Sequence, residues 1–185
     1  MSIARSAQPL SPAVWRYGMP AIVLHWVLAV LIAFLVVLGW SMMTVERQPE
    51  GPFYFDLHRS FGLLAAVLIA LRVGWRFTHG PAALPAKLPR WQVQASSATH
   101  WLLYVCMVVM PITGFVGSQY SKAGIRFFGL PLPTWTEPVR SVSHLMFTIH
   151  SATVWVLVAL VIVHAAAGFK HLLVDRDAVF QRMWF

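Results

Sequence analysis

The segment "HSATVWVLVALVIVH", residues 150–164, begins and ends with histidine, and the residues between are apolar except for Ser151 and Thr153. It lies in an apolar stretch, about residues 145–174, that is long enough to cross a membrane as a helix. Histidine within a membrane span is costly and marks a candidate functional site. Because fourteen residues make almost four helical turns, His150 and His164 share one helix face, about 21 Å apart along its axis.

Three further stretches, at about residues 21–43, 57–78 and 97–118, are apolar enough to span a membrane. Segments rich in Pro and Gly separate the four spans. The chain is 58% hydrophobic and 11% charged, whereas soluble domains carry about a quarter charged residues. We therefore predict an all-α, four-helix transmembrane bundle that forms a single domain over residues 1–185.

The chain carries a formal net charge of +8, from 14 basic and 6 acidic residues. In a chain this apolar, the excess favours loops facing the cytoplasm and anionic lipid, not a nucleic-acid partner. With the N-terminus inside, nine basic residues face the cytoplasm and five face outward, which predicts an N-in, C-in orientation. The nine are Arg5, Arg16, Arg72, Arg76, Lys87, Arg90, Lys170, Arg176 and Arg182, and the five are Arg47, Arg59, Lys122, Arg126 and Arg140. The first span is too long for the apolar region of a signal peptide, and no clear small-residue cleavage site follows it, so we expect it to be retained.

The predicted orientation places two more histidines at the depths of the first two. His25 lies in the first turns of the first span, near the inner side like His164. His58 begins the second span, near the outer side like His150. Two imidazoles at one depth, on different helices of a bundle, can ligate a haem iron from both sides, and ligation by neutral imidazole avoids burying a charge. The four histidines therefore favour two haems stacked across the membrane.

The second ring nitrogen of a ligating histidine needs a hydrogen-bond partner, and Ser151 and Thr153 are nearby candidates for this role. The remaining histidines fit a loop or interface better. His79 lies in a loop, and His144 precedes the fourth span. His100, at the inner end of the third span, is either interfacial or near a cofactor.

Three stretches together resemble the bacterial cytochrome b561 family of four-helix, di-haem membrane cytochromes. They are "IVLHWVLAVLIAF" (22–34), "DLHRSFGLL" (56–64) and "HSATVWVLVALVIVHAAAGFKHLLVDRD" (150–177). The resemblance covers about residues 16–183. It implies the bacterial inner membrane and two haem b groups, the inner one held by His25 with His164 and the outer one by His58 with His150. The chain has no C-x-x-C-H motif, so thioether attachment of haem is not expected.

Several arginines are candidates for contacts with haem propionates. Arg72 follows His58 by fourteen residues on roughly the same face, so its partner is either a propionate or the lipid headgroups reached by snorkelling. Arg16, just before the first span, has the same two options. Arg59 lies beside His58 and belongs to an outer basic group, which also contains Lys122, Arg126 and Arg140. That group would anchor propionates, dock an acidic redox partner, attract a small anion such as superoxide, or contact lipid.

His171, Lys170 and Arg76 are candidates for a quinone pocket near the inner haem, with positive-inside anchoring as the alternative. The leading hypothesis is a membrane cytochrome that moves single electrons between the quinone pool and a periplasmic donor or acceptor. The resemblance implies superoxide as a donor and ubiquinone as an acceptor. One alternative is the cytochrome b subunit of a larger membrane oxidoreductase, such as a hydrogenase. Another is a haem-free transporter or scaffold, but this leaves the paired histidines without a role, and the spans lack acidic residues for proton coupling.

Overall fold

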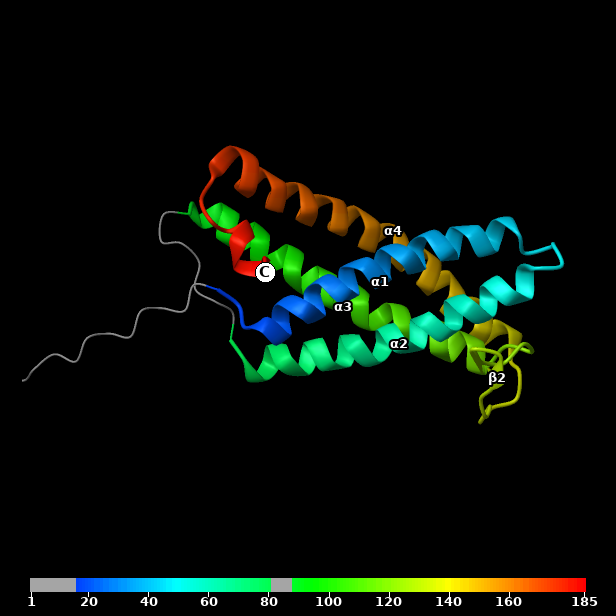
Figure 1. The fold of residues 1–185 in the computed structure, drawn as a ribbon. Coiled ribbons are helices and arrows are strands. Elements are labelled where there is room, and N and C mark those ends of the chain that lie inside the picture. The colour runs from blue at the N-terminus through cyan, green and yellow to red at the C-terminus, as the bar shows by residue number, and fades with distance from the viewer. Residues whose placement is uncertain (1–15, 81–87) are drawn as a thin grey trace, which may run out of the picture.

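The computed structural model describes residues 16–80 and 88–185, so Arg5 and Lys87 of the charge count lie outside it. Four long helices dominate this part of the chain (Figure 1). They are α1 (Met19–Thr44), α2 (Gly51–Thr78), α3 (Arg90–Gln119) and α4 (Arg140–Lys170). Each is long and apolar enough to cross a membrane. The prediction of an all-α, four-helix transmembrane architecture is therefore confirmed.

All four helices begin earlier than hydropathy predicts, and the difference is largest for the second and the third. The second begins at Gly51 instead of about residue 57, and the third begins at Arg90 instead of about residue 97. Hydropathy finds the segment that lipid tails surround, whereas a helix continues into the headgroup region while its polar side chains reach water. Pro52 suits the first turn of α2, where its missing N–H would have no helical partner.

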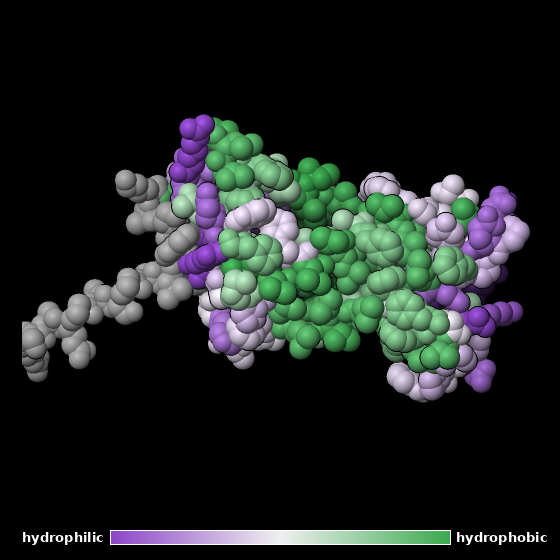
Figure 2. All heavy atoms as spheres, viewed as in Figure 1, coloured by the Kyte–Doolittle hydropathy of each residue, from purple (hydrophilic) through white to green (hydrophobic). Residues whose placement is uncertain are grey.

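The helices run up and down, so that the connections alternate between the two ends of the bundle (Figure 1). The start of α1, the end of α2, the start of α3 and the C-terminus lie at one end, which we call the inner end after the predicted orientation. The α1–α2 and α3–α4 connections lie at the outer end. Figure 2 shows hydrophobic residues over the middle of the visible face and hydrophilic residues towards both ends, the distribution that a bilayer requires.

Packing between the helices follows the order of the chain. The first helix packs along α2, α2 against α3, and α3 along α4, with a small apolar core around Leu28, Ala65 and Ile69. Only 6% of the most apolar window of α4 is buried inside the chain. Most of that helix surface is therefore left to contact lipid or other groups.

The inner end of α4 departs from regular helix. It continues as a π-helical turn, η1 (His171–Asp175), after which Arg176 and Ala178 adopt positive φ of 51° and 63°. A short 3-10 helix, η2 (Phe180–Met183), then leads the C-terminal segment back to α1. This turn ends at Asp175, one residue beyond the expected limit of the fourth span, and it is wider than an α-helical turn.

A small hairpin, which the sequence analysis treated as loop, covers part of the outer end. Its strands β1 (Arg126–Phe127) and β2 (Leu130–Pro131) pair antiparallel through a turn with φ of 48° at Phe128 and 86° at Gly129. Two positive φ values are typical of the tight turns that match strand twist. Because phenylalanine rarely adopts this conformation, the Phe-Gly pair is a weak signal in the sequence.

Candidate functional site

The inner pair of histidines joins the first and last helices. His25 of α1 and His164 of α4 lie with ring centroids 6.0 Å apart and ring planes at 77°. These two helices do not pack along each other, so the imidazoles meet across the interior of the bundle. The two residues that share a depth in the sequence analysis are thus neighbours in space.

The outer pair has nearly the same geometry. His58 of α2 and His150 of α4 have ring centroids 6.2 Å apart and ring planes at 77°. His58 lies about two turns inside α2, because that helix begins at Gly51. The fourth helix therefore presents one histidine to each pair, and α1 and α2 present the partners.

Both pairs have the separation that a single axially ligated iron requires. Two imidazoles bonded to one metal from opposite sides, with bonds of about 2 Å, have ring centroids about 6 Å apart. The observed values of 6.0 and 6.2 Å agree with this geometry. Neutral imidazole nitrogens from two helices are the donor set that b-type haem uses, so the residues present fit the group.

The hydrogen bonding of His150 favours ligation of a metal through its Nε2 atom. Its Nδ1 lies 2.9 Å from the carbonyl oxygen of Met110 and 3.3 Å from the hydroxyl of Thr113, both on α3. A donated Nδ1–H leaves Nε2 with the lone pair that binds a metal. Thr153, one of the two candidate partners, instead donates to the Ile149 carbonyl of its own helix, as Thr in helices commonly does.

Two glycines that the sequence analysis missed lie against the outer histidines. A Cβ on Gly39 of α1 would lie 3.3 Å from Cε1 of His58, and a Cβ on Gly114 of α3 would lie 3.2 Å from Cε1 of His150. Both distances are tighter than ordinary packing, so a side chain at either position would displace an imidazole. Small residues inside apolar spans are the sequence signal for such close approach.

Buried polar atoms without hydrogen-bond partners occur on four described residues, three of which are candidates for cofactor binding. Among the described residues these atoms are Nε of Arg16, Nδ1 of His58, one terminal nitrogen of Arg76 and Oε1 of Gln181. The ring of His58 faces the backbone of Leu35 without a hydrogen bond of ordinary geometry. Such atoms are rare in native proteins and point to a missing partner group.

Three further cationic or titratable side chains surround the inner pair. Arg72 donates to the Ala21 carbonyl at 3.0 Å and lies 3.5 Å from Nδ1 of His25, so it points into the bundle and does not snorkel to the surface. The ring of His100 lies 5.2 Å from that of His164. Arg76 is within electrostatic range of both Arg72 and His100. This cluster of positive charge suits an anionic group such as a propionate.

The outer basic group is partly neutralised. Arg59 lies 3.3 Å and Arg126 lies 3.7 Å from the two carboxylate oxygens of Asp56. Ser60, which is fully buried, accepts the Phe128 N–H at 2.7 Å and thereby holds the hairpin on α2. The hairpin therefore brings Arg126 to the turn of α2 that carries His58.

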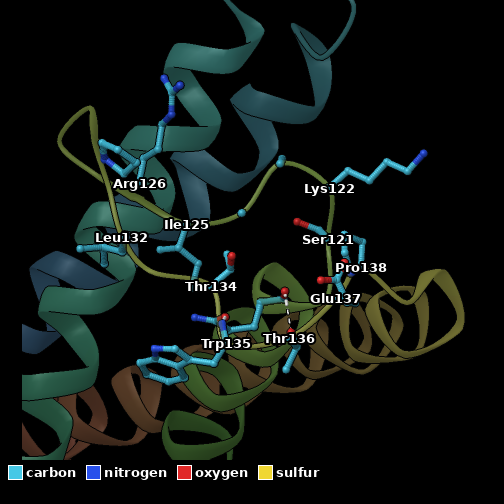
Figure 3. Close-up of a pocket in the computed structure, with 14 residues that line it drawn as sticks. Ser121, Lys122, Ile125, Arg126, Leu132, Thr134, Trp135, Thr136, Glu137 and Pro138 are labelled. Atoms are coloured by element: carbon cyan, nitrogen blue, oxygen red, sulfur yellow. Dashed lines mark hydrogen bonds between the residues drawn. The ribbon is translucent and has the colours of Figure 1, made fainter.

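A hollow of about 550 Å³ lies in the outer loop beside this hairpin. Figure 3 shows that Lys122 and Arg126 point away from it towards the surface. Inside, the Gln119 amide accepts the Trp135 N–H at 3.2 Å and donates to the Pro133 carbonyl at 3.3 Å, which stabilises the loop. The cations of this loop therefore face outward, where they would meet a solute or a partner.

The three residues predicted for a quinone site divide into two groups. His171 and Lys170 lie at the end of α4 and contact acidic residues, His171 with Asp177 at 2.7 Å and Lys170 with Asp175. Arg76 lies instead with His100 on the other helices. The structure thus brings together the first two but associates Arg76 with the inner histidine pair.

Arg16 contacts the C-terminal segment instead of the helices. Its guanidinium donates to the main-chain carbonyl of Trp184. The neighbouring Tyr17 ring lies 5.4 Å from the guanidinium carbon of Arg182, and burial lowers the pKa of that arginine. Arg16 and Tyr17, which precede α1, are therefore held to the C-terminal segment at the inner end.

A four-helix membrane bundle with two histidine pairs at different depths defines the class of membrane electron-transfer cytochromes. The chain matches the family described as prokaryotic cytochrome b561 over residues 16–185. It therefore belongs to the prokaryotic cytochrome b561 family, a family of multi-pass bacterial membrane cytochromes whose members bind haem b.

Curated relatives support this assignment along almost the whole chain. "Cytochrome b561 homolog 2" of Escherichia coli is 27% identical over 172 residues, which cover 91% of this chain and 90% of the relative. "Cytochrome b561 homolog 1" of the same organism is 24% identical, with 91% and 96% covered. A third relative, named "Probable superoxide oxidase CybB", from Yersinia pestis, is 22% identical, with 91% and 95% covered.

Proposed function

We propose that this protein is a di-haem b-type cytochrome of the bacterial inner membrane that moves single electrons between its outer face and the quinone pool. The observation that carries the proposal is the pair of histidine contacts, each with the ring separation that suits one iron. Membership in the cytochrome b561 family supports it independently. The charge asymmetry of the loops supports an N-in, C-in orientation.

In this proposal His25 and His164 hold the inner haem, and His58 and His150 hold the outer haem. A b-type haem supplies reversible one-electron chemistry, and the protein supplies orientation and electrostatics. The Met110 carbonyl fixes the ring of His150 by accepting its Nδ1–H. Fourteen residues of α4 separate the two sites by about 21 Å.

Arginines are the proposed partners of the anionic haem propionates. Arg72 and Arg76 lie beside the inner pair, and one terminal nitrogen of Arg76 is buried without a partner. Arg16 has a buried Nε that is also without a partner. At the outer site Arg59 is the residue next to His58, and Asp56 already offsets part of its charge. The bidentate fork of arginine suits a carboxylate of this kind.

The proposed electron donor is superoxide, and the proposed acceptor is ubiquinone. A relative named as a probable superoxide oxidase supports the donor, as does the basic outer group that attracts a small anion. Two superoxide ions lose one electron each and become two molecules of dioxygen. One ubiquinone takes up these two electrons and two protons and becomes ubiquinol. His171 and Lys170 lie at the inner end, where protons are available, and remain candidates for contacts with the quinone.

The first test is a reduced-minus-oxidised visible spectrum of detergent-purified protein, with haem counted as its pyridine haemochrome. Wild-type protein should carry two b-type haems per chain, and His58→Ala and His164→Ala should each lose one. His79→Ala, which changes a histidine outside both pairs, should keep both haems. A colourless wild-type protein from haem-sufficient cells would contradict the proposal.

A further inference from the structure

An apolar pocket of about 540 Å³ lies at the inner end of the bundle, with walls from α1, the end of α4 and the C-terminal segment. That segment, drawn in red in Figure 1, turns back from α4 towards the start of α1. The lining residues are Trp26, Phe169, Leu172, Phe180, Gln181 and Trp184. All but one of them are apolar or aromatic, so the pocket suits a hydrocarbon occupant.

Hydrogen bonds to main-chain carbonyls hold one wall of the pocket in place. The Trp26 indole N–H donates to the Met183 carbonyl at 2.7 Å, and the Tyr17 N–H donates to the Arg182 carbonyl at 3.2 Å. The rings of Trp26 and Trp184 also meet edge to face, with centroids 5.5 Å apart. The C-terminal segment is thus fixed against α1, and the pocket is a built feature of the fold.

The walls of the pocket are open to the surroundings of the protein. Two of its lining side chains are large, apolar and exposed, Phe169 at 54% and Trp184 at 48%. The first and fourth helices do not pack along each other, so the space between them at this end is not closed by helix packing. Water in an apolar hollow of a membrane span finds few hydrogen-bond partners, whereas a lipid tail needs none.

Two arginines beside the pocket have no acidic partner. The guanidinium of Arg16 donates to the main-chain carbonyl of Trp184, and Nε of Arg176 donates to that of Leu173 at 3.4 Å. Neither arginine forms an ion pair with any residue of 16–80 or 88–185. Both therefore carry positive charge that an anion from outside the chain could neutralise.

The acidic side chains of the inner end are occupied elsewhere. Asp175 contacts Lys170, and Asp177 lies 2.7 Å from Nδ1 of His171. No other acidic side chain lies in the segments that the predicted orientation places inside. An excess of positive charge therefore remains beside an apolar pocket, which is the combination that recognises an anionic lipid.

The two parts of the site have different roles in recognition. Lipid tails are as apolar as the pocket, so moving a tail from the bilayer into it changes the surroundings of that tail little. The pocket therefore accommodates any acyl chain of suitable size. Selection among lipids depends on the head group, because an arginine near the membrane surface attracts a net negative charge.

We propose that this pocket holds one acyl chain of an anionic phospholipid from the inner leaflet, with the phosphate of its head group on Arg176. Arg16, beside Trp184, adds to the positive charge at the rim. The bound lipid closes the space between α1 and the end of α4 that the chain itself leaves open. This inference does not depend on haem binding, so it and the proposed function can fail separately.

The first test is native mass spectrometry of the haem-loaded protein in mild detergent. Phosphatidylglycerol and phosphatidylcholine with identical acyl chains are added in equal amounts. Wild-type protein should retain one phosphatidylglycerol per chain, with an affinity about fivefold higher than for phosphatidylcholine, the preference that one arginine near the membrane surface supplies.

Two neighbouring tryptophan substitutions test the pocket itself. Leu172→Trp fills it, whereas Leu173→Trp places the same side chain at a position that is 65% exposed and outside it. We expect Leu172→Trp to weaken retention of phosphatidylglycerol by about tenfold or more, because the tail no longer fits. Leu173→Trp should retain it as wild type does, and thermal unfolding shows whether each variant is folded.

A substitution outside the pocket tests the head-group contact. Arg176→Gln should retain phosphatidylglycerol and phosphatidylcholine equally, since the acyl chain still fits but the charge is gone. Arg90→Gln removes a cation at the same end of the bundle, on α3, and should keep the wild-type preference. These variants leave the apolar walls intact, so they decide the question even if Leu172→Trp does not fold.

Photolabelling gives a direct readout of position. A phosphatidylglycerol with a diazirine in its acyl chain should label residues 169–184, as mapped by mass spectrometry, and unlabelled phosphatidylglycerol should compete. Labels that map elsewhere, or equal retention of the two lipids by wild-type protein, would overturn the proposal. Displacement of the bound lipid by a stoichiometric amount of short-chain ubiquinone would also overturn it, because the pocket would then belong to another ligand.

Discussion

The imidazoles of His25 and His164, from the first and last helices of the bundle, lie with ring centroids 6.0 Å apart. Arg72 lies 3.5 Å from Nδ1 of the same His25. A histidine that ligates through Nε2 carries its proton on Nδ1, which can then accept nothing from a guanidinium. In the proposed cytochrome Arg72 would therefore turn the nitrogen that faces His25 towards a propionate, while its other terminal nitrogen keeps its bond to the Ala21 carbonyl.

This arrangement predicts that Arg72 raises the reduction potential of the inner haem. Reduction adds an electron, and a nearby buried cation stabilises the reduced form. We expect Arg72→Gln to lower the potential of the haem that is lost in His164→Ala and to leave the other haem nearly unchanged. A redox titration followed at the visible bands measures both, and Arg90→Gln, at the exposed start of α3, is the control. Equal potentials in wild type and Arg72→Gln would exclude this role.

The close contact between Gly114 and His150 predicts a local effect of adding one methyl group. Gly114→Ala should push the imidazole, reduce occupancy or shift the spectrum of the outer haem only, and cost about 1–3 kcal/mol of stability. Gly62→Ala is the matched control, because a Cβ there meets no atom within 4 Å. Haem content and thermal unfolding measure the effect. Two unaltered haems in Gly114→Ala would show that the contact does not position His150.

Asp56 lies between two arginines of the outer basic group. Because its negative charge offsets theirs, we predict that Asp56 weakens the attraction of this group for anions. Removing its charge in Asp56→Asn should speed reduction of the haems by superoxide about threefold at low ionic strength. Added salt should diminish the gain, because surface charges are screened. Glu46→Gln, at an exposed outer position, is the control. A slower reaction in Asp56→Asn would argue against steering by Arg59 and Arg126.

The hydrogen bonds of Ser60 predict that this side chain stabilises the outer hairpin. It accepts the Phe128 N–H at 2.7 Å and donates to the Asp56 carbonyl at 2.7 Å. Ser60→Ala leaves a backbone N–H without its partner, at a cost of about 1–3 kcal/mol. Hydrogen exchange across residues 126–131 should become faster, while Ser151→Ala, at an exposed position, should not alter it. Unchanged exchange in Ser60→Ala would mean that other contacts hold the hairpin.

The predicted orientation is checked with fusions at the two ends of the bundle. A fluorescent protein that matures only in the cytoplasm should fluoresce when it is joined after Phe185. Alkaline phosphatase, which is active only outside, should be active when it is inserted in the α3–α4 connection. The reverse pattern would place the inner histidine pair at the periplasmic face.

Local patterns in the sequence were sufficient to predict the bundle and the pairing of four histidines by their depth. Hydropathy identifies the spans because lipid acts on every residue of a span, and the helical repeat fixes the depths of His150 and His164. These properties depend on positions along one helix. Whether the histidines ligate haem remains a prediction that the spectra described above test.

The remaining features depend on contacts between helices, which no local pattern determines. The carbonyl that holds His150 belongs to Met110 on α3, and Gly39 lies against His58 of another helix. The hairpin was not predicted because its turn is formed by a Phe-Gly pair, which rarely adopts this conformation. The inner pocket forms only because the C-terminal segment returns to Trp26. Sequence spacing gives no information about which of these surfaces meet.

The fourth helix carries a histidine of each pair on one uninterrupted stretch of α-helix, whereas α1 and α2 carry one histidine apiece. In the proposed cytochrome this helix would set the distance between the two irons. The first haem to bind would set the height and rotation of the helix and so prepare the site for the second. Assembly of the two centres would then be cooperative, and cells short of haem would contain empty and fully loaded protein in preference to half-loaded protein.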